Sequence, residues 1–175
     1  MCIRDSHIPG SIFIGLDGRF APWVGEILED VSKKLIIVAP EGREKEAIIR
    51  LSRVGFDNVI GYLEGGINSW IKNGGIVSKV LNESASKFST IDNDKDILDV
   101  RSKNEHKSES LLNSINIPLI DLSKSIDKVS FEKTFYVHCK GGYRSMIAAS
   151  ILLANGISNF SNIAGGYDKI KNYNS

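Results

Sequence analysis

An internal repeat constrains the fold of this 175-residue chain more than any other feature of its sequence. Two stretches resemble each other at an offset of about 100 residues, and four pairs of short segments carry the match. The pairs are Leu35–Ala39 with Phe135–Cys139, Gly55–Val59 with Gly156–Phe160, Glu64–Gly66 with Ala164–Gly166, and Ser11–Ile14 with Ser114–Ile117. A repeat of this kind predicts two copies of one supersecondary unit. We assign copy one to residues 7–78 and copy two to residues 82–175.

Each copy alternates apolar runs with stretches of helical spacing. Ile36–Val38 and Phe135–His138 are continuous apolar or β-branched runs, typical of strands that are buried on both faces. The stretch after the second run has helical apolar spacing and ends at Asn155-Gly156, a pair typical of a helix C-terminus. The alternation predicts an α/β fold in which each copy has a mainly parallel central sheet flanked by helices. In such sheets the ligand site lies at the carboxyl ends of the strands.

The first six residues, Met1–Ser6, resemble the translation of a transposase adapter used in sequencing libraries. We therefore predict that residues 1–6 are not native, that the native sequence begins at His7, and that the chain is a fragment of a longer protein. Copy one is then incomplete at its N-terminus, and Cys139 is the only native cysteine. An ordinary frayed terminus is the alternative interpretation.

Composition excludes several classes of protein. Lys and Arg number 22 against 21 Asp and Glu, so the net charge of +1 provides no basis for binding nucleic acid or an anionic membrane surface. The 2 cysteines are too few for a disulfide scaffold or a four-cysteine zinc site. No apolar run approaches the ~20 residues that a membrane-spanning helix needs. We predict a soluble, cytoplasmic globular protein.

Cys139 lies where chemistry is expected, after a buried strand and before a helix. The loop from Cys139 to Arg144 leads into that helix and can point several backbone N–H groups inward. Gly141 and Gly142 allow the positive φ angles that such a nest requires. Because the helix N-terminus adds partial positive charge, the loop favours an anion: a thiolate, a persulfide or an incoming oxyanion.

Side chains of the loop favour the same anion. Lys140 and Arg144 add positive charge, and Ser145 can cap the helix or donate a hydrogen bond to the sulfur. Free thiols ionise near pH ~8.5, and positive surroundings favour the thiolate at lower pH. The ordinary role of a lone cysteine is that of a small buried hydrophobe. The combination of strand, Gly-Gly, Arg-Ser and helix favours a nucleophile instead.

The segment Val137–Ala149 resembles the active-site loop of the rhodanese (sulfurtransferase) family. Further landmarks of that family occur in order: Asp99–Arg101, Asn116–Leu119 and Ala164–Gly166 in copy two, and His7–Ser11 and Leu63–Trp70 in copy one. The resemblance implies two rhodanese-like domains and a nucleophilic Cys139 that carries a transient persulfide. It also implies that Arg144 anchors the loop or binds substrate. The other residues whose backbone amides are expected to cradle the anion are Lys140, Gly141, Gly142, Tyr143 and Ser145.

Loop length separates two chemistries within this resemblance. The spacing from Cys139 to Arg144 is Cys-x4-Arg, the sulfurtransferase length, whereas related phosphatases use Cys-x5-Arg to form a wider ring of amides. The sequence also has no evident general-acid carboxylate just beyond the loop. We therefore predict transfer of a sulfane sulfur from thiosulfate or a low-molecular-weight persulfide to sulfite, cyanide or a thiol.

Two alternatives to the sulfurtransferase stay open. One is a non-enzymatic sulfur-relay or interaction module, in which Cys139 is buried. The other is a cysteine-dependent phosphatase, which releases phosphate from an aryl ester.

Copy one departs from the family pattern. Ala39 stands at the position of the nucleophile, which abolishes covalent catalysis. Pro40 lacks the N–H that the ring would use, and Glu41 and Glu44 bring negative charge to an anion site. Of the loop's functional residues, Arg43 alone survives. We interpret residues 7–78 as an inactive rhodanese-like module for packing, docking or positioning.

An inactive copy followed by an active one is similar to the C-terminal part of bacterial metallo-β-lactamase-type persulfide dioxygenase–rhodanese fusions. This resemblance implies a dioxygenase domain upstream in the full-length chain. The alternative is a tandem rhodanese without any dioxygenase domain. The present sequence lacks the His-rich metal motif of that domain, so we predict no metal and no cofactor here. The expected partners are a small-molecule sulfur donor and acceptor, and the sequence leaves a homo-oligomer open.

Two further residue patterns near the loop have ordinary structural interpretations. Side chains alternate across a strand, so His138 is expected to point away from the Cys139 side chain. Asp99 and Arg101 lie near the carboxyl edge of the predicted sheet, where we expect an ion pair that supports the fold.

Overall fold

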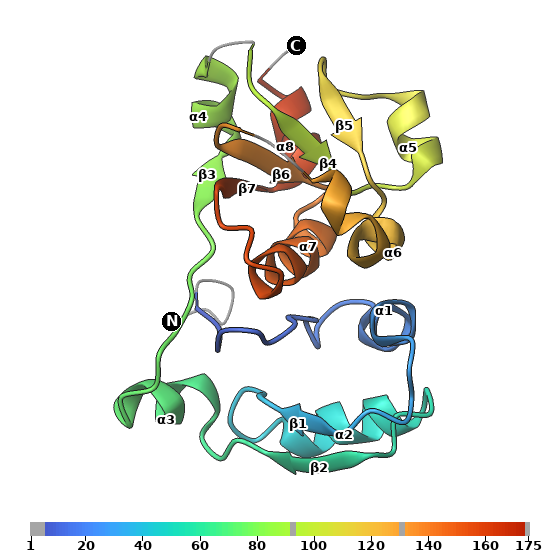
Figure 1. The fold of residues 1–175 in the computed structure, drawn as a ribbon, viewed down its shortest axis with the longest axis vertical. Helices are drawn as coiled ribbons and strands as arrows, with labels where there is room; N and C mark the ends of the chain where they lie inside the picture. The colour runs from blue at the N-terminus through green and yellow to red at the C-terminus, as the bar shows by residue number, and fades with distance from the viewer. Residues whose placement is uncertain (1–5, 92–93, 130–131, 174–175) are drawn as a thin grey trace. The chain divides into compact units, whose positions relative to one another are not determined.

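The computed structural model describes residues 6–91, 94–129 and 132–173, which form two compact units (Figure 1). Unit 1 comprises the described residues up to Pro9 together with Ile14–Lys79. Unit 2 comprises Gly10–Phe13 together with the chain from Val80 onward. Both units alternate strands with helices, which confirms the predicted α/β class. Within these ranges, no helix has the length and apolar character needed to cross a membrane.

Unit 2 is built on a five-stranded sheet. Its strands are β3 (Asn82–Ser84), β4 (Ile97–Asp99), β5 (Ser114–Asn116), β6 (Phe135–His138) and β7 (Phe160–Ala164). They lie in the order β3-β7-β6-β4-β5, and every neighbouring pair is parallel. The predicted parallel central sheet is therefore confirmed, and the carboxyl ends of β4, β6 and β7 lie side by side.

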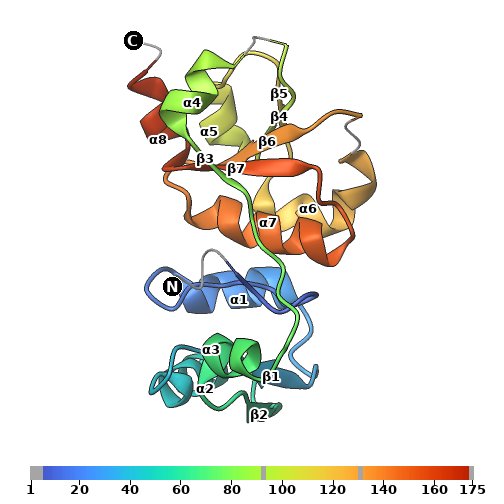
Figure 2. The same cartoon turned by 90° about the vertical axis from the view of Figure 1, so that its left-hand side faces the viewer.

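Helices cover both faces of this sheet (Figure 2). They are α4 (Ala85–Thr90), α5 (Lys103–Ser108), α6 (Leu119–Leu122), the 3-10 helix η1 (Ser123–Lys128), α7 (Tyr143–Ala154) and α8 (Gly166–Lys171). Figure 2 shows α6 and α7 on one face and α4 and α8 on the other. The predicted end of α7 is confirmed, because Asn155 is its C-cap and Gly156 follows with φ 79°.

Strand β6 supports the site because it is buried on both faces. Phe135 and Val137 are 1% and 0% exposed, and His138 is also buried. Tyr136 points to the α4 face, where its ring meets the ring of Phe88 edge-on with centroids 5.3 Å apart. The prediction of a doubly covered strand is confirmed here.

Unit 1 contains a two-stranded parallel sheet of β1 (Leu35–Ile37) and β2 (Val59–Tyr62). Its helices are α1 (Phe20–Leu28), α2 (Glu44–Ser52) and α3 (Gly66–Lys72). Leu35, Ile37 and Val59 pack against a core made by Phe20, Val24, Leu51 and Phe56.

The prediction that Ile36–Val38 is buried on both faces was wrong. Ile36 is 67% exposed, and Ile60 of the neighbouring strand is 59% exposed. Side chains alternate across a strand, and the core of unit 1 reaches only the face that carries Leu35 and Ile37.

Candidate active site

Cys139 follows β6 directly and is 1% exposed. Its Sγ accepts a hydrogen bond from the backbone N–H of Gly142 at 3.1 Å. The thiol also contacts Ser145, donating to Oγ at 3.6 Å, and that hydroxyl in turn donates to the Gly142 carbonyl at 3.2 Å. The sulfur is therefore buried among polar groups at the start of α7.

Gly142 has the backbone conformation that this contact requires. Its φ is 100°, in the region that L side chains rarely adopt, and a Cβ here would meet the Gly165 nitrogen at 3.5 Å. The expectation of a positive φ at Gly141 was wrong, because positive φ is found at Gly142 alone of the two glycines. One such residue suffices to turn the Gly142 N–H toward the sulfur.

Gly166 allows a second close approach beneath the loop. A Cβ on Gly166 would collide with the carbonyl oxygen of Cys139 and lie 2.6 Å from that of Lys140. Because the backbone of Gly166 lies so close to the loop, the N–H of Tyr167 donates a hydrogen bond to the Cys139 carbonyl at 2.7 Å. The N–H of Asp168 likewise donates to the Lys140 carbonyl at 3.1 Å. The sequence analysis identified this glycine only as part of a family landmark, because nothing local indicates what lies against it.

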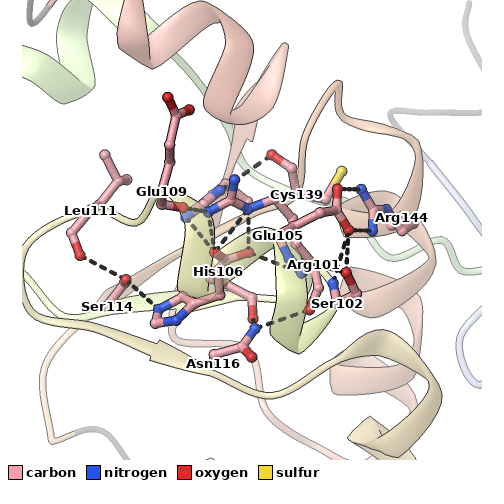
Figure 3. Close-up of polar contacts among 12 residues, drawn as sticks. Arg101, Ser102, Glu105, His106, Glu109, Leu111, Ser114, Asn116, Cys139 and Arg144 are labelled. Atoms are coloured by element: carbon pink, nitrogen blue, oxygen red, sulfur yellow. Dashed lines mark hydrogen bonds and ion pairs between the residues drawn. The ribbon is translucent and has the colours of Figure 1, made fainter.

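Arg144 is held by a carboxylate on another helix. Its Nη1 and Nη2 donate to Oε2 and Oε1 of Glu105 at 2.6 Å and 2.7 Å (Figure 3). The hydrogen bonds from Arg144, assisted by those from Ser102, lower the pKa of Glu105 to about 2. The pKa of Arg144 is raised in turn by its hydrogen bonds to Glu105. Of the two predicted roles of Arg144, this geometry fits the anchoring of the loop.

Glu105 was missed by the sequence analysis, although part of its role has a sequence signal. Ser102 and Glu105 form the capping box that begins α5, a pattern of Ser followed three residues later by Glu. The pattern predicts the helix start. It does not predict the contact with Arg144, which lies 39 residues further along the chain.

Asp99 and Arg101 form the predicted ion pair under the loop. Their side chains are 0% and 4% exposed, and Nη2 of Arg101 lies 2.7 Å from Oδ2 of Asp99. The guanidinium also donates to the Glu109 carbonyl and lies over the ring of Tyr167, 4.1 Å from its centroid. Arg101 therefore connects the end of β4 to α8.

His138 contacts the backbone of Cys139. Its Nδ1 lies 3.2 Å from the Cys139 carbonyl oxygen, and its Nε2 lies 4.0 Å from Oδ2 of Asp99. Burial lowers the pKa of His138, and the Asp99 carboxylate opposes that shift. Because a carbonyl oxygen only accepts, Nδ1 is the donor in this contact. The contacts found for the ring agree with the expectation that it points away from the sulfur.

The other predicted loop residues lie around the thiol with different exposure. Lys140 and Gly141 are exposed, whereas Tyr143 is half-buried. The amide of Gly142 contacts Sγ at 3.1 Å, and anion binding by the amides of Lys140, Gly141, Tyr143 and Ser145 stays a prediction. In residues 6–91, 94–129 and 132–173, no group of three or more His, Cys, Asp and Glu side chains could hold a metal ion.

The corresponding loop of unit 1 has a different charge arrangement. Ala39 is 4% exposed and has no sulfur to offer. The guanidinium of Arg43 pairs with Asp17 at 2.8 Å and with Glu46 at 2.8 Å. These carboxylates raise the pKa of Arg43 and neutralise its charge for any other anion.

Comparison with known proteins places this geometry in a family. Residues 3–73 and 84–173 match the Rhodanese-like domain. The uncharacterized protein YqhL of Bacillus subtilis is 34% identical over 73 residues, which are 42% of this chain and 58% of that protein. The tRNA sulfurtransferase of Thermoplasma acidophilum is 34% identical over 82 residues, 47% of this chain and 16% of that protein. The chain thus spans less than two thirds of either relative.

Solved structures have also been compared with the chain. The thiosulfate sulfurtransferase of Pseudomonas aeruginosa is 18% identical, with a TM-score of 0.47. The similarity covers 99% of this chain and 37% of that one.

Proposed function

Since the chain belongs to the family of rhodanese-like domains, we propose that it is a sulfurtransferase that acts through a persulfide on Cys139. The donor is thiosulfate or a low-molecular-weight persulfide, and the acceptor is a thiophile. The observation that carries this proposal is the hydrogen bond from the Gly142 amide to Sγ of Cys139, at the start of α7. A backbone donor and a helix N-terminus provide partial positive charge at the position where the sulfur of a transferred group would sit.

The proposed reaction has two steps. In the first, the Cys139 thiolate attacks the outer sulfur of thiosulfate, a new S–S bond forms, and the donor S–S bond breaks as sulfite leaves with the electron pair. In the second, the acceptor attacks the outer sulfur of the Cys139 persulfide, and the electron pair of the broken bond returns to the cysteine. In this scheme the Gly142 amide donates to Sγ, and the other amides of the loop are expected to donate to the outer sulfur of the persulfide.

Arg144 and Lys140 have separate roles in this scheme. Glu105 takes up two N–H groups of the Arg144 guanidinium, so Arg144 acts by holding the start of α7. Lys140 is exposed beside the nucleophile, where its charge attracts an anionic donor.

The direct test is the mass of the protein after incubation with thiosulfate. Wild type gains one sulfur atom and loses it when cyanide or sulfite is added. Cys139→Ser, checked for folding by circular dichroism, gains none. Absence of the adduct on wild type, or turnover by Cys139→Ser, contradicts the proposal.

One observation favours the alternative of a non-enzymatic relay or interaction module. Cys139 is only 1% exposed, as that alternative predicts. Labelling of Cys139 by iodoacetamide distinguishes the non-enzymatic module from the sulfurtransferase. The relay or interaction module predicts that native protein stays unlabelled while urea-unfolded protein reacts, and that thiosulfate is not turned over. The sulfurtransferase predicts labelling of the native protein and protection by prior incubation with thiosulfate.

The order of an inactive and an active module supports a proposal about the whole protein. We propose that the chain is the C-terminal part of a persulfide dioxygenase–rhodanese fusion. The support is the resemblance in domain order, with Ala39 and Cys139 at corresponding loop positions. The genomic sequence upstream of the His7 codon tests this proposal. We expect it to encode a metallo-β-lactamase-like domain with its His-rich motif. Absence of such a domain would contradict the proposal.

A further inference from the structure

Beside the Cys139 loop lies a cavity of about 350 Å³, and we propose that it binds the zwitterionic head group of an amino-acid persulfide, which is then the preferred sulfur donor. This inference rests on the proposed function and deepens it. The cavity is largely open to solvent, so it is suited to holding the polar head of a small ligand while the rest of the ligand extends outside it.

The cavity adjoins the peptide that carries the nucleophile. Its lining includes Arg101 after β4, Lys140 after β6, and Tyr167 and Asp168 after β7. Because these three strands are neighbours and parallel, their carboxyl ends bring the residues together. The backbone N–H groups of Tyr167 and Asp168 donate to the carbonyls of Cys139 and Lys140, so the cavity wall is bonded directly to the loop.

Most of the charge around the cavity is already neutralised within the protein. Arg101 is paired with Asp99, and Glu105 is paired with Arg144. Lys140 and Asp168 are both exposed, and no ion pair within 4 Å is found for either side chain among the described residues, although Lys140 interacts electrostatically with Glu109 and Asp168 with Lys171. The cavity therefore offers one ammonium group and one carboxylate to a ligand, together with the ring of Tyr167.

A ligand that complements this pair carries one charge of each sign. The α-carboxylate of an amino acid suits Lys140, and its α-ammonium suits Asp168. An inorganic dianion such as thiosulfate is attracted by Lys140 but repelled by Asp168, so it complements the cavity less well. The charges thus select an α-amino-acid donor over an inorganic one.

The transfer from such a donor balances without a further reactant. The Cys139 thiolate attacks the outer sulfur of R–S–SH and a new S–S bond forms. The donor S–S bond breaks, and the electron pair leaves with the inner sulfur as the amino-acid thiolate R–S⁻. The transferred sulfur keeps its proton or exchanges it with water, so the products are the Cys139 persulfide and the free thiol or thiolate.

The first experiment measures the rate of sulfur loading with cysteine persulfide and with thiosulfate. Asp168→Asn removes the carboxylate, and Asp127→Asn is the matched control on the exposed surface of η1. In Asp168→Asn, we expect the ratio of kcat/KM for cysteine persulfide to kcat/KM for thiosulfate to fall about fivefold, the size of one exposed ion pair. Asp127→Asn keeps the wild-type ratio. An unchanged ratio in Asp168→Asn overturns the inference.

A binding experiment separates this inference from the proposed function. S-methylcysteine carries both head-group charges but cannot donate a sulfane sulfur, and it is titrated into the 175-residue chain by NMR. Shifts of the Lys140 and Asp168 amide signals that weaken in Asp168→Asn support the cavity even if sulfur loading fails. Loading by thiosulfate without any such shift rejects the cavity and leaves the proposed function intact.

Discussion

Arg144 and Glu105 form a two-point ion pair, with N–O distances of 2.6 Å and 2.7 Å, across 39 residues of sequence. The pair joins the first turn of α7 to α5, and Glu105 also accepts hydrogen bonds from the backbone N–H and Oγ of Ser102. The orientation of α7, which begins after the Cys139 loop, therefore depends on a carboxylate on α5, at another part of the sheet's carboxyl edge.

Replacing Glu105 by Gln should give a stability defect that depends on pH. The folded pKa of Glu105 is about 2, below the ordinary 4.5, so its contribution is fully present above pH 4.5 and is lost as pH falls toward 2. We expect Glu105→Gln to lower the free energy of unfolding by about 1 kcal/mol at pH 7. Urea denaturation of both proteins between pH 7 and pH 2 should show this difference shrinking steadily below pH 4.5.

The control for that series is Glu132→Gln, since Glu132 is exposed and no ion pair is found for it in the described part of the chain. Its stability should follow wild type at every pH. A constant defect of Glu105→Gln across the series would show that packing, and not charge, accounts for the effect.

Gly142 and Gly141 form a matched pair for testing loop strain. Gly142→Ala places a Cβ on a residue with φ 100°, and we expect it to cost about 1–3 kcal/mol. Gly141→Ala meets nothing within 4 Å and should change stability by less than about 0.5 kcal/mol. Thermal and urea unfolding of both variants measure these changes in the free energy of unfolding. Equal losses in the two would contradict the assigned loop geometry.

Asp99→Asn should be the most destabilising of these changes. It leaves the Arg101 guanidinium, whose side chain is 4% exposed, without its counter-charge, at a cost of about 3 kcal/mol. Asp127→Asn, at an exposed position of η1, serves as the surface control. Chemical denaturation that finds the two variants equally stable would rule out a structural role for the buried pair.

Restoring a cysteine to unit 1 should not restore chemistry there. In Cys139→Ser, the added change Ala39→Cys is expected to give no sulfur adduct with thiosulfate by mass spectrometry. Pro40 supplies no backbone donor, and Arg43 is already paired with Asp17 and Glu46. Adduct formation in this double variant would show that the nucleophile alone was missing from unit 1.

The Cys139 loop was predictable because its signals are local. The apolar run before Cys139, the Gly-Gly pair and the apolar spacing of the following helix predicted strand, loop and helix, all of which are found. Each of these signals depends on only a few neighbouring residues: the backbone preference of a residue, the spacing of apolar residues, or the missing N–H of a proline. For the same reason, the departures of Ala39 and Pro40 from the family pattern could be identified in the sequence. Even the wrong expectation at Gly141 concerned which of two adjacent glycines carries the positive φ.

Tertiary structure decided what those local signals could not. Glu105 as the partner of Arg144, the close approach of Gly166 to the Cys139 carbonyl, and the exposure of Ile36 all involve segments far apart in sequence. A residue's neighbours across a sheet depend on strand order and on which faces are covered, and neither quantity is encoded in any short stretch of chain. The sequence by itself therefore determined that Cys139 lies in a loop between a buried strand and a helix, and only the fold determined which side chains hold that loop and border the adjoining cavity.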